Sequence, residues 1–178
     1  MHTEQQYDEA VKACKRIFLL KTADYGTAWR VLRPISIVDQ LFIKAKRIRT
    51  IQETGVQRVG DDIPGEFQGI LNYGVIGLIQ LQKGNAVVED IPADTASALY
   101  DEGVLTARTV MLAKNHDYGE AWRDMSQEGL VDLILVKLLR IRQILANDGR
   151  TLISEGIDAG YVDIINYAAF ALILNGFA

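Results

Sequence analysis

Three acidic residues near the C-terminus have a spacing that could hold a divalent cation. Glu155, Asp158 and Asp163 precede Asn166 in the pattern Glu-x-x-Asp-x-x-x-x-Asp-x-x-Asn. On a helix, Glu155, Asp158 and Asn166 share a face, and Asp163 lies about 80° from Glu155. Oxygen ligands at this spacing suit Mg²⁺, which keeps several waters and bridges to phosphate groups. The alternative is that these acids form the solvated start of a helix, where negative charge is favourable.

Two cations upstream could face those acids or a phosphate. Lys137 and Arg140 are three residues apart in the apolar run LVDLILVKLLRIRQIL, so they lie on one face of a helix. Burying cations without anions is costly, so a carboxylate or a phosphate must lie opposite them. Salt bridges to a neighbouring helix, or long side chains that reach solvent, would satisfy them equally well.

An aromatic block precedes this helix, and it reads Lys-x-x-Asp-Tyr-Gly-x-Ala-Trp-Arg from Lys114 to Arg123. Its lysine could bind phosphate, and Tyr118 or Trp122 could stack on a base. The block could equally be a helix end, a glycine turn and a packed aromatic pair. The nucleotide-binding candidates are Lys114, Asp117, Tyr118, Trp122, Lys137, Arg140 and Asn166.

The chain contains a duplication, because most of these residues occur twice. Tyr7 to Ile51 and Tyr100 to Ile144 share 19 identities in 45 aligned positions, and the aromatic block returns from Lys21 to Arg30. We define module 1 as residues 7–81 and module 2 as residues 100–174, joined by a linker at 82–99. Two fused copies, and not a solenoid, are expected at so long a period.

Each module is expected to contain three helices. Apolar residues recur at helical spacing over 4–22, 36–53 and 66–81, and again over 95–115, 129–146 and 157–174. No segment alternates convincingly as a strand would. We therefore predict an all-α fold in which tandem duplicated three-helix modules pack as a pseudo-symmetric helical bundle.

The third helices of the two modules differ in their acids. Glu66 aligns with Gly160, and Gly69 aligns with Asp163. Either module 1 has become a scaffold, or Glu66 joins the acids of module 2 in a shared site. Because the modules agree on the aromatic block and the cation pair but differ in these acids, we expect any chemistry to be asymmetric and centred on module 2, with module 1 as partner or scaffold.

Composition limits the classes of function. The chain has 178 residues, is 49% hydrophobic and 24% charged, and carries a net charge of −4. This is typical of a soluble globular protein and argues against general nucleic-acid binding. The polar N-terminus shows no signal peptide, and no apolar run approaches the roughly eighteen residues of a membrane span. We expect a cytoplasmic protein with no membrane partner.

The ordered set K-x-x-D-Y-G-x-x-W, K-x-x-R and E-x-x-D-x-x-x-x-D-x-x-N-Y resembles a family of bacterial and phage proteins. This is the nucleotide-modification-associated domain family, a domain of unknown function. The resemblance covers both modules and is closer in module 2. It implies a small helical protein associated with nucleotide metabolism.

A weaker resemblance is to the MazG-type all-α nucleoside triphosphate pyrophosphohydrolases. These bind Mg²⁺ through Glu and Asp on adjacent helices and split a triphosphate between its α and β phosphates. The E-E-x-x-E block of those enzymes is missing from this chain.

Together these features predict a Mg²⁺-dependent nucleotide-binding protein that resembles a (d)NTP pyrophosphohydrolase. Glu155, Asp158 and Asp163 would hold the metal, whose bound water would attack a phosphoryl group. No residue is identified as catalytic beyond these ligands. The alternatives are a non-catalytic helical module that binds a nucleotide or a protein, and a structural subunit. The sequence leaves open whether the chain forms a homo-oligomer.

Overall fold

The protein is a bundle of helices in which the order of elements occurs twice. The computed structural model describes residues 2–89 and 91–177, and these contain six α-helices and no strand. Module 1 contains α1 (Thr3–Tyr25), the 3₁₀ turn η1 (Ala28–Val31), α2 (Pro34–Thr54) and α3 (Ile63–Lys83). Module 2 contains α4 (Ala93–Tyr118), η2 (Ala121–Asp124), α5 (Gln127–Ala146) and α6 (Ile157–Leu174). The predicted all-α tandem fold is therefore confirmed, and the expected helices extend by up to three residues at an end.

Local signals set the ends of these helices. Asp62 and Ser126 cap α3 and α5, because their side chains accept from backbone N–H groups three residues on, at 2.7 and 3.0 Å. Gly26 and Gly119 end α1 and α4 at φ of 67° and 59°, a conformation that favours glycine. The chain then turns through η1 or η2, which carries the tryptophan of each aromatic block.

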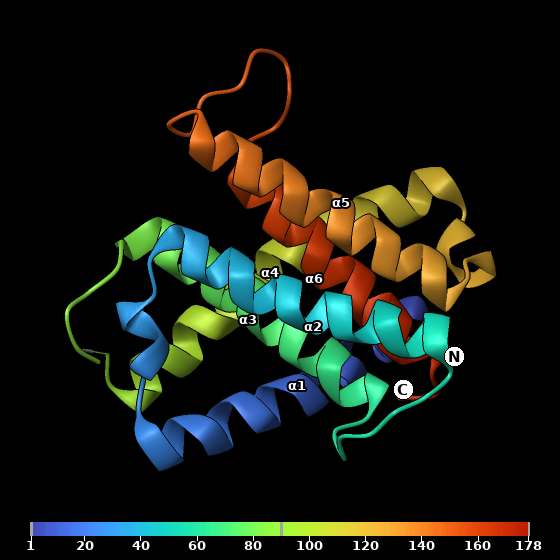
Figure 1. Ribbon diagram of the computed structural model, residues 1–178, viewed down its shortest axis with the longest axis horizontal. Helices are drawn as coiled ribbons and strands as arrows, with labels where there is room; N and C mark the ends of the chain where they lie inside the picture. The colour runs from blue at the N-terminus through green and yellow to red at the C-terminus, as the bar shows by residue number, and fades with distance from the viewer. Residues whose placement is uncertain (1, 90, 178) are drawn as a thin grey trace.

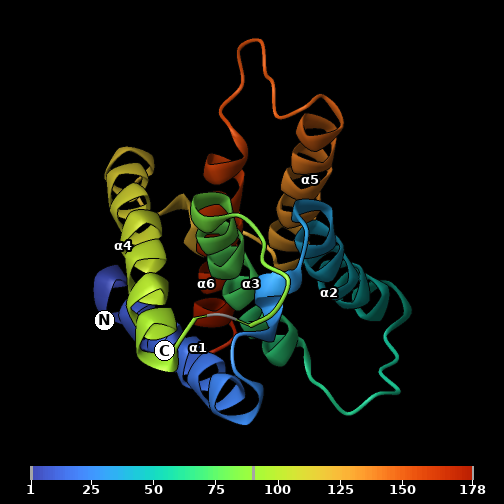
Figure 2. The ribbon, with the colours of Figure 1, turned by 90° about the vertical axis from the view of Figure 1, so that its left-hand side faces the viewer.

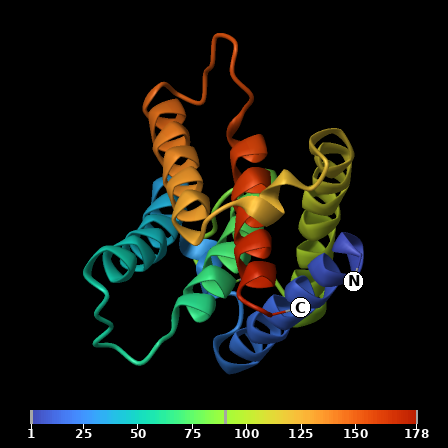
Figure 3. The same cartoon turned by 90° about the vertical axis from the view of Figure 1, so that its right-hand side faces the viewer.

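The helices pair across the two modules and form three layers (Figures 1 and 2). The α3–α6 pair lies in the centre, with α1 and α4 on one side and α2 and α5 on the other. Figure 3 shows the loops 55–62 and 147–156 leaving the bundle in different directions, one from each module. Each layer thus contains one helix from each module.

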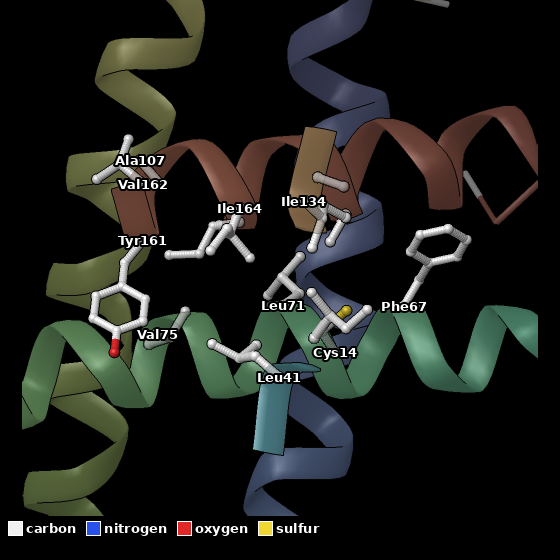
Figure 4. Close-up of a cluster of buried hydrophobic side chains, with 14 of the residues drawn as sticks. Cys14, Leu41, Phe67, Leu71, Val75, Ala107, Ile134, Tyr161, Val162 and Ile164 are labelled. Atoms are coloured by element: carbon white, nitrogen blue, oxygen red, sulfur yellow. The ribbon is translucent and has the colours of Figure 1, made fainter. Parts of the chain in front are cut away.

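The central pair is antiparallel and closely packed (Figure 4). A Cβ atom at Gly77 would lie 2.7 Å from the Tyr161 ring, and one at Gly74 would lie 2.8 Å from Ile165. These contacts need glycine on α3, where α6 has alanine at the equivalent positions. Figure 4 shows the buried side chains that fill the space between α3, α6 and their neighbours.

The α6 helix is also long and apolar enough, by length and composition, to cross a membrane. Because 67% of that segment is buried inside the bundle, its apolar character has an explanation as a core helix.

Ion pairs between the modules occur in equivalent sets. On one side of the bundle Arg108 pairs with Asp8 at 2.7 Å, and the equivalent Lys15 pairs with Asp101 at 2.8 Å. On the other side the same relation joins α2 and α5, through the pairs Arg49–Asp132 and Arg142–Asp39. Several residues that are shared by the two copies therefore form ion pairs across the interface between the modules, which we call the joint.

Candidate functional site

Asp163 lies between two lysines of module 2. Lys114 Nζ, near the end of α4, is 2.8 Å from Oδ1 of Asp163, and Lys137 Nζ on α5 is 2.8 Å from Oδ2. The Asp163 side chain is only 8% exposed, while those of Lys137 and Lys114 are 18% and 50% exposed. We call these three residues the Asp163 cluster. The structure thus brings together three of the residues predicted from the sequence.

Mutual charge compensation governs the Asp163 cluster. Burial alone would raise the pKa of the Asp163 carboxyl, but hydrogen bonds from Lys114 and Lys137 outweigh it, so the pKa is lowered. Burial would lower the pKa of the Lys114 ammonium, but the bond to Asp163 outweighs it and the pKa is raised. Asp163 and Lys114 are therefore both held in their charged forms.

The other two predicted metal ligands do not join Asp163 in an acidic cluster. Both are exposed, Glu155 in the loop before α6 and Asp158 in the first turn of α6. Within residues 2–89 and 91–177, no three His, Cys, Asp or Glu side chains lie so that they could hold a metal ion. Both oxygens of Asp163 accept from lysines, and this arrangement does not fit Mg²⁺. Mg²⁺ binding by these acids stays a prediction that would require the lysines to release Asp163.

The aromatic block of module 2 is mainly a packing element. Trp122 stacks on Phe170 with ring centroids 4.4 Å apart, and the Arg123 guanidinium lies 4.4 Å from the Trp122 centroid. The indole Nε1 donates to Asn115 at 2.9 Å. The Phe170 ring and the Arg123 guanidinium cannot both lie this close on the same face of the indole, so they cover its two faces. Trp122 therefore has no free face on which a base could stack. Tyr118 is 71% exposed and remains able to stack on a ligand.

Asp117 also lies at the surface, where its carboxylate is 3.0 Å from His116 Nδ1. Neither side chain reaches the Asp163 cluster through a hydrogen bond or ion pair in the described part of the chain. The predicted phosphate-binding role of Asp117 remains a prediction without a partner in this geometry.

Asn166 joins the two modules. Its Oδ1 accepts from the Tyr7 hydroxyl at 2.7 Å, and its Nδ2 donates to the Ala107 carbonyl at 3.1 Å. The equivalent Asn72 accepts from Tyr100 at 2.7 Å and donates to the Cys14 carbonyl at 3.0 Å. Both amides are buried and engaged within the protein, so Asn166 is explained by packing and not by a ligand.

Arg140 is exposed and lines a groove of about 860 Å³ between α5 and the loop 147–156. Lys137 and Glu155 line the same groove. In module 1 the equivalent Arg47 is tied down, since it donates to the carbonyls of Val59 and Asp61 at 3.3 and 2.7 Å. Arg140 has no such hydrogen bond among residues 2–89 and 91–177, so the loop above it lacks this anchor.

The corresponding carboxylate of module 1 is Glu66, one helical turn earlier on α3. Glu66 pairs with Arg47 at 3.0 Å and lies 3.8 Å from Lys44, the equivalent of Lys137. Where module 2 has Asp163, module 1 has Gly69, and the Lys44 chain passes 3.0 Å from where a Cβ would be. The Lys44 side chain thus occupies the space that a carboxylate at position 69, equivalent to that of Asp163, would need.

Glu66 does not reach the acids of module 2. Gly77 contacts Tyr161 in the antiparallel central pair, with Glu66 eleven residues before Gly77 and Asp163 two residues after Tyr161. At 1.5 Å per residue, Glu66 and Asp163 are about 13 Å apart along the pair. This separation does not favour the alternative of one site shared by the two modules.

A cavity of about 230 Å³ lies in module 1, between the second half of α1, η1, α2 and the start of α3. Two cations, Lys21 and Lys44, and four aromatic side chains face one space; the aromatic residues are Phe18, Tyr25, Trp29 and Tyr73. We call it the module 1 cavity. The acidic residues on its wall are Asp61, Asp62 and Glu66.

Three differences between the modules open this cavity. Gly69 replaces Asp163 and Ile76 replaces Phe170, so both side chains are smaller in module 1. Thr22 replaces Asn115, the acceptor for the tryptophan N–H of module 2. Accordingly, Trp29 Nε1 is buried with no hydrogen-bond partner among the described residues. A buried unpaired donor is rare and favours an acceptor from outside the protein.

Sequence reasoning missed the module 1 cavity because Gly69 looked like the loss of a ligand. The sequence does contain a signal for it. Module 1 lacks the carboxylate of Asp163 because Gly69 is at that position, but it retains both lysines, Lys21 and Lys44. Cations kept without their carboxylate indicate an anion from elsewhere.

Comparison with known proteins gives one family. A family model described as nucleotide modification associated domain 1 matches the chain twice, at residues 21–81 and 114–174. Each match begins at a lysine of the two equivalent sets, Lys21 or Lys114, and runs through the third helix of its module. No curated protein and no solved structure matches the chain.

Proposed function

The chain belongs to the nucleotide modification associated domain 1 family, and we propose that it binds a phosphorylated nucleoside in the module 1 cavity. The observation that carries this proposal is the gathering of Lys21, Lys44, Tyr25, Trp29 and Tyr73 around one cavity. Cations and aromatic faces are the two kinds of group that a nucleotide needs from a protein.

The lysines supply the phosphate end of the proposed site. Lys21 is exposed and forms no ion pair among the described residues, and Lys44 is 3.8 Å from its nearest carboxylate, Glu66. Glu66 bonds more closely to Arg47, at 3.0 Å. Lys21 and Lys44 therefore keep positive charge available for a phosphate.

The aromatic residues supply the base end. Tyr25 is 54% exposed and Tyr73 is partly buried, so both can offer a ring surface to a flat ligand. Trp29 would donate its unpaired N–H to a base or sugar oxygen. At about 230 Å³ the cavity is smaller than most ligand pockets, so it would enclose one end of a nucleotide and leave the rest at its mouth.

A second candidate is Mg²⁺-dependent hydrolysis of a (d)NTP to a monophosphate and pyrophosphate. The observation that favours it is the presence of Asp61, Asp62 and Glu66 on the wall that also carries the lysines. Asp62 already caps α3, and Glu66 is already paired, so the fit to a metal rests on Asp61. If the protein binds a nucleotide but does not hydrolyse it, the function is non-catalytic nucleotide binding.

Binding should be measured by calorimetry with a panel of (d)NMPs and (d)NTPs, without and with Mg²⁺. We expect Lys21→Ala to weaken binding at least ten-fold, or about 1.4 kcal/mol, because it removes a phosphate contact without breaking an ion pair. Lys12→Ala is the matched control, since Lys12 is an exposed lysine of the same helix outside the cavity. No heat and no thermal shift with any nucleotide would refute the proposal.

Hydrolysis is tested on the same panel by release of pyrophosphate. Turnover that requires Mg²⁺, stops with a chelator and falls in Asp61→Asn would support the second candidate. Tight binding with no product would exclude it while leaving the nucleotide-binding proposal intact.

A further inference from the structure

The two modules offer the same pair of lysines to different third groups. Lys21 and Lys44 of module 1 are equivalent to Lys114 and Lys137 of module 2. In module 2 both lysines bond to Asp163, at 2.8 Å each. In module 1 the equivalent position is Gly69, and the module 1 cavity opens there.

The Asp163 carboxylate is placed as an anionic ligand would be. It lies at the centre of the cation pair, each oxygen takes one ammonium group, and it is almost fully buried. A phosphate bound between two lysines would make the same kind of bonds through two of its oxygens. The difference is that Asp163 is tied to α6, so module 2 holds its anion permanently.

The aromatic residues behind the lysines match this difference. Phe170 fills the space beside Trp122 and stacks on it, where Ile76 leaves space beside Trp29. Asn115 accepts from Trp122 Nε1 at 2.9 Å, where Thr22 leaves the Trp29 donor unpaired. Module 2 is thus filled by its own side chains at the positions where module 1 is open.

We propose that Asp163 is a built-in counter-anion that occupies a second phosphate site, and that the chain therefore binds its phosphorylated ligand only in module 1. This rests on the proposed function for the statement about module 1, but not for the site in module 2. Removal of the Asp163 carboxylate leaves Lys114 and Lys137 without the one carboxylate that lies within ion-pair distance of them in the described part of the chain. An inorganic phosphate or pyrophosphate then takes its place.

The test is the stoichiometry of inorganic pyrophosphate binding, measured by calorimetry for wild type, Asp163→Gly and Asp163→Ser. We expect one site in the wild type and two in either variant. Asp163→Ser removes the charge with less helix destabilisation than glycine, so it keeps the test open if Asp163→Gly does not fold. Asp124→Ser is the matched control, because Asp124 is an exposed aspartate of the same module outside the Asp163 cluster, and it should keep a single site.

Rescue of stability gives a second readout. Pyrophosphate should raise the melting temperature of Asp163→Ser more than that of the wild type, because only the variant gains a site. Adding Lys114→Ala to Asp163→Ser should remove both the second site and the extra rescue.

The outcomes separate the two proposals. One site in the wild type and still one in both Asp163 variants would overturn this inference and leave the proposed function standing. No site in the wild type and one in the variants would support the inference and count against module 1 as the phosphate site. No binding in any form would overturn both.

Discussion

Modules 1 and 2 share their helices and their lysine pair. Beside the lysines, module 2 is filled by its own side chains, whereas module 1 contains a cavity. In module 2 Asp163, Phe170 and Asn115 neutralise the lysines, fill the space beside the tryptophan and pair its N–H. In module 1 Gly69, Ile76 and Thr22 do none of these, and a cavity of about 230 Å³ results. Three side-chain differences on a common helical framework therefore accompany the cavity of module 1, where module 2 is packed.

The joint between the modules shows the opposite behaviour, because it has stayed symmetrical. Asn72 and Asn166 make equivalent hydrogen bonds, each to a tyrosine of the other module. The pairs Arg49–Asp132 and Arg142–Asp39 are likewise the same contact made twice. Symmetry is kept where each module must recognise the other and is lost where a ligand would bind.

The largest effect should come from removing the anion of module 2. Asp163→Ala should lower the free energy of unfolding by about 3 kcal/mol, because Lys114 and the mostly buried Lys137 lose their counter-ion. Glu66→Ala in module 1 should cost less, since Arg47 keeps two backbone carbonyl acceptors. Urea denaturation measures both. Equal losses would show that the two carboxylates play the same part.

Acid should reveal the same contrast through pH. The pKa of the Asp163 carboxyl is lower in the folded protein than its ordinary value of about 3.9, so its stabilisation is present above that pH. It is lost as the pH falls through the folded-state pKa. The stability difference between wild type and Asp163→Asn should therefore shrink below about pH 4. A constant difference down to acid unfolding would contradict this.

The symmetrical joint should give the next largest loss of stability. Asn72→Ala and Asn166→Ala should each cost about 2 kcal/mol, because each leaves a buried tyrosine hydroxyl without its acceptor and removes a second hydrogen bond to a helix carbonyl. The two losses should agree within about 0.5 kcal/mol. Tyr7→Phe and Tyr100→Phe are the controls, which remove only the hydroxyl. An unequal pair of losses would show that the joint is asymmetric as well.

The fold followed from the sequence because its signals were local and repeated. Helical periodicity, the glycines after α1 and α4, and the duplication predicted six helices in two modules. The capping roles of Asp62 and Ser126 are read from the same local chemistry.

The site was harder to predict because it depends on contacts between segments far apart in sequence. Asn166 looked like a ligand, yet its partners lie on α1 and α4. Asp163 looked like a metal ligand, since nothing local reveals that Lys114 and Lys137 both reach it. Gly69 looked like a loss, although an absent side chain is what makes room for a ligand.

A substitution at Gly69 should close the module 1 cavity. Gly69→Asp should weaken nucleotide binding at least ten-fold, or about 1.4 kcal/mol, because the new carboxylate would take Lys21 and Lys44 as Asp163 takes its own lysines. The Lys44 side chain, 3.0 Å from the position of the new Cβ, is flexible enough to move. Gly69→Ala adds volume without charge and should weaken binding less. Calorimetry distinguishes them, and equal effects would mean that space, not charge, limits binding.

The smallest effect should come from the exposed ion pairs of the joint. Arg49→Ala and Arg142→Ala should each change the free energy of unfolding very little, because exposed pairs are screened by water. The carboxylates that they face are 57% exposed, and the N–O distances are 3.5 and 3.4 Å. Arg142 also lies 4.9 Å from the Phe42 centroid, so its loss should exceed that of Arg49 slightly. A double-mutant cycle with Asp132 or Asp39, repeated in 1 M salt, isolates each pair. A coupling above about 1 kcal/mol would mean that surface charge, and not the buried tyrosine–asparagine bonds, holds the modules together.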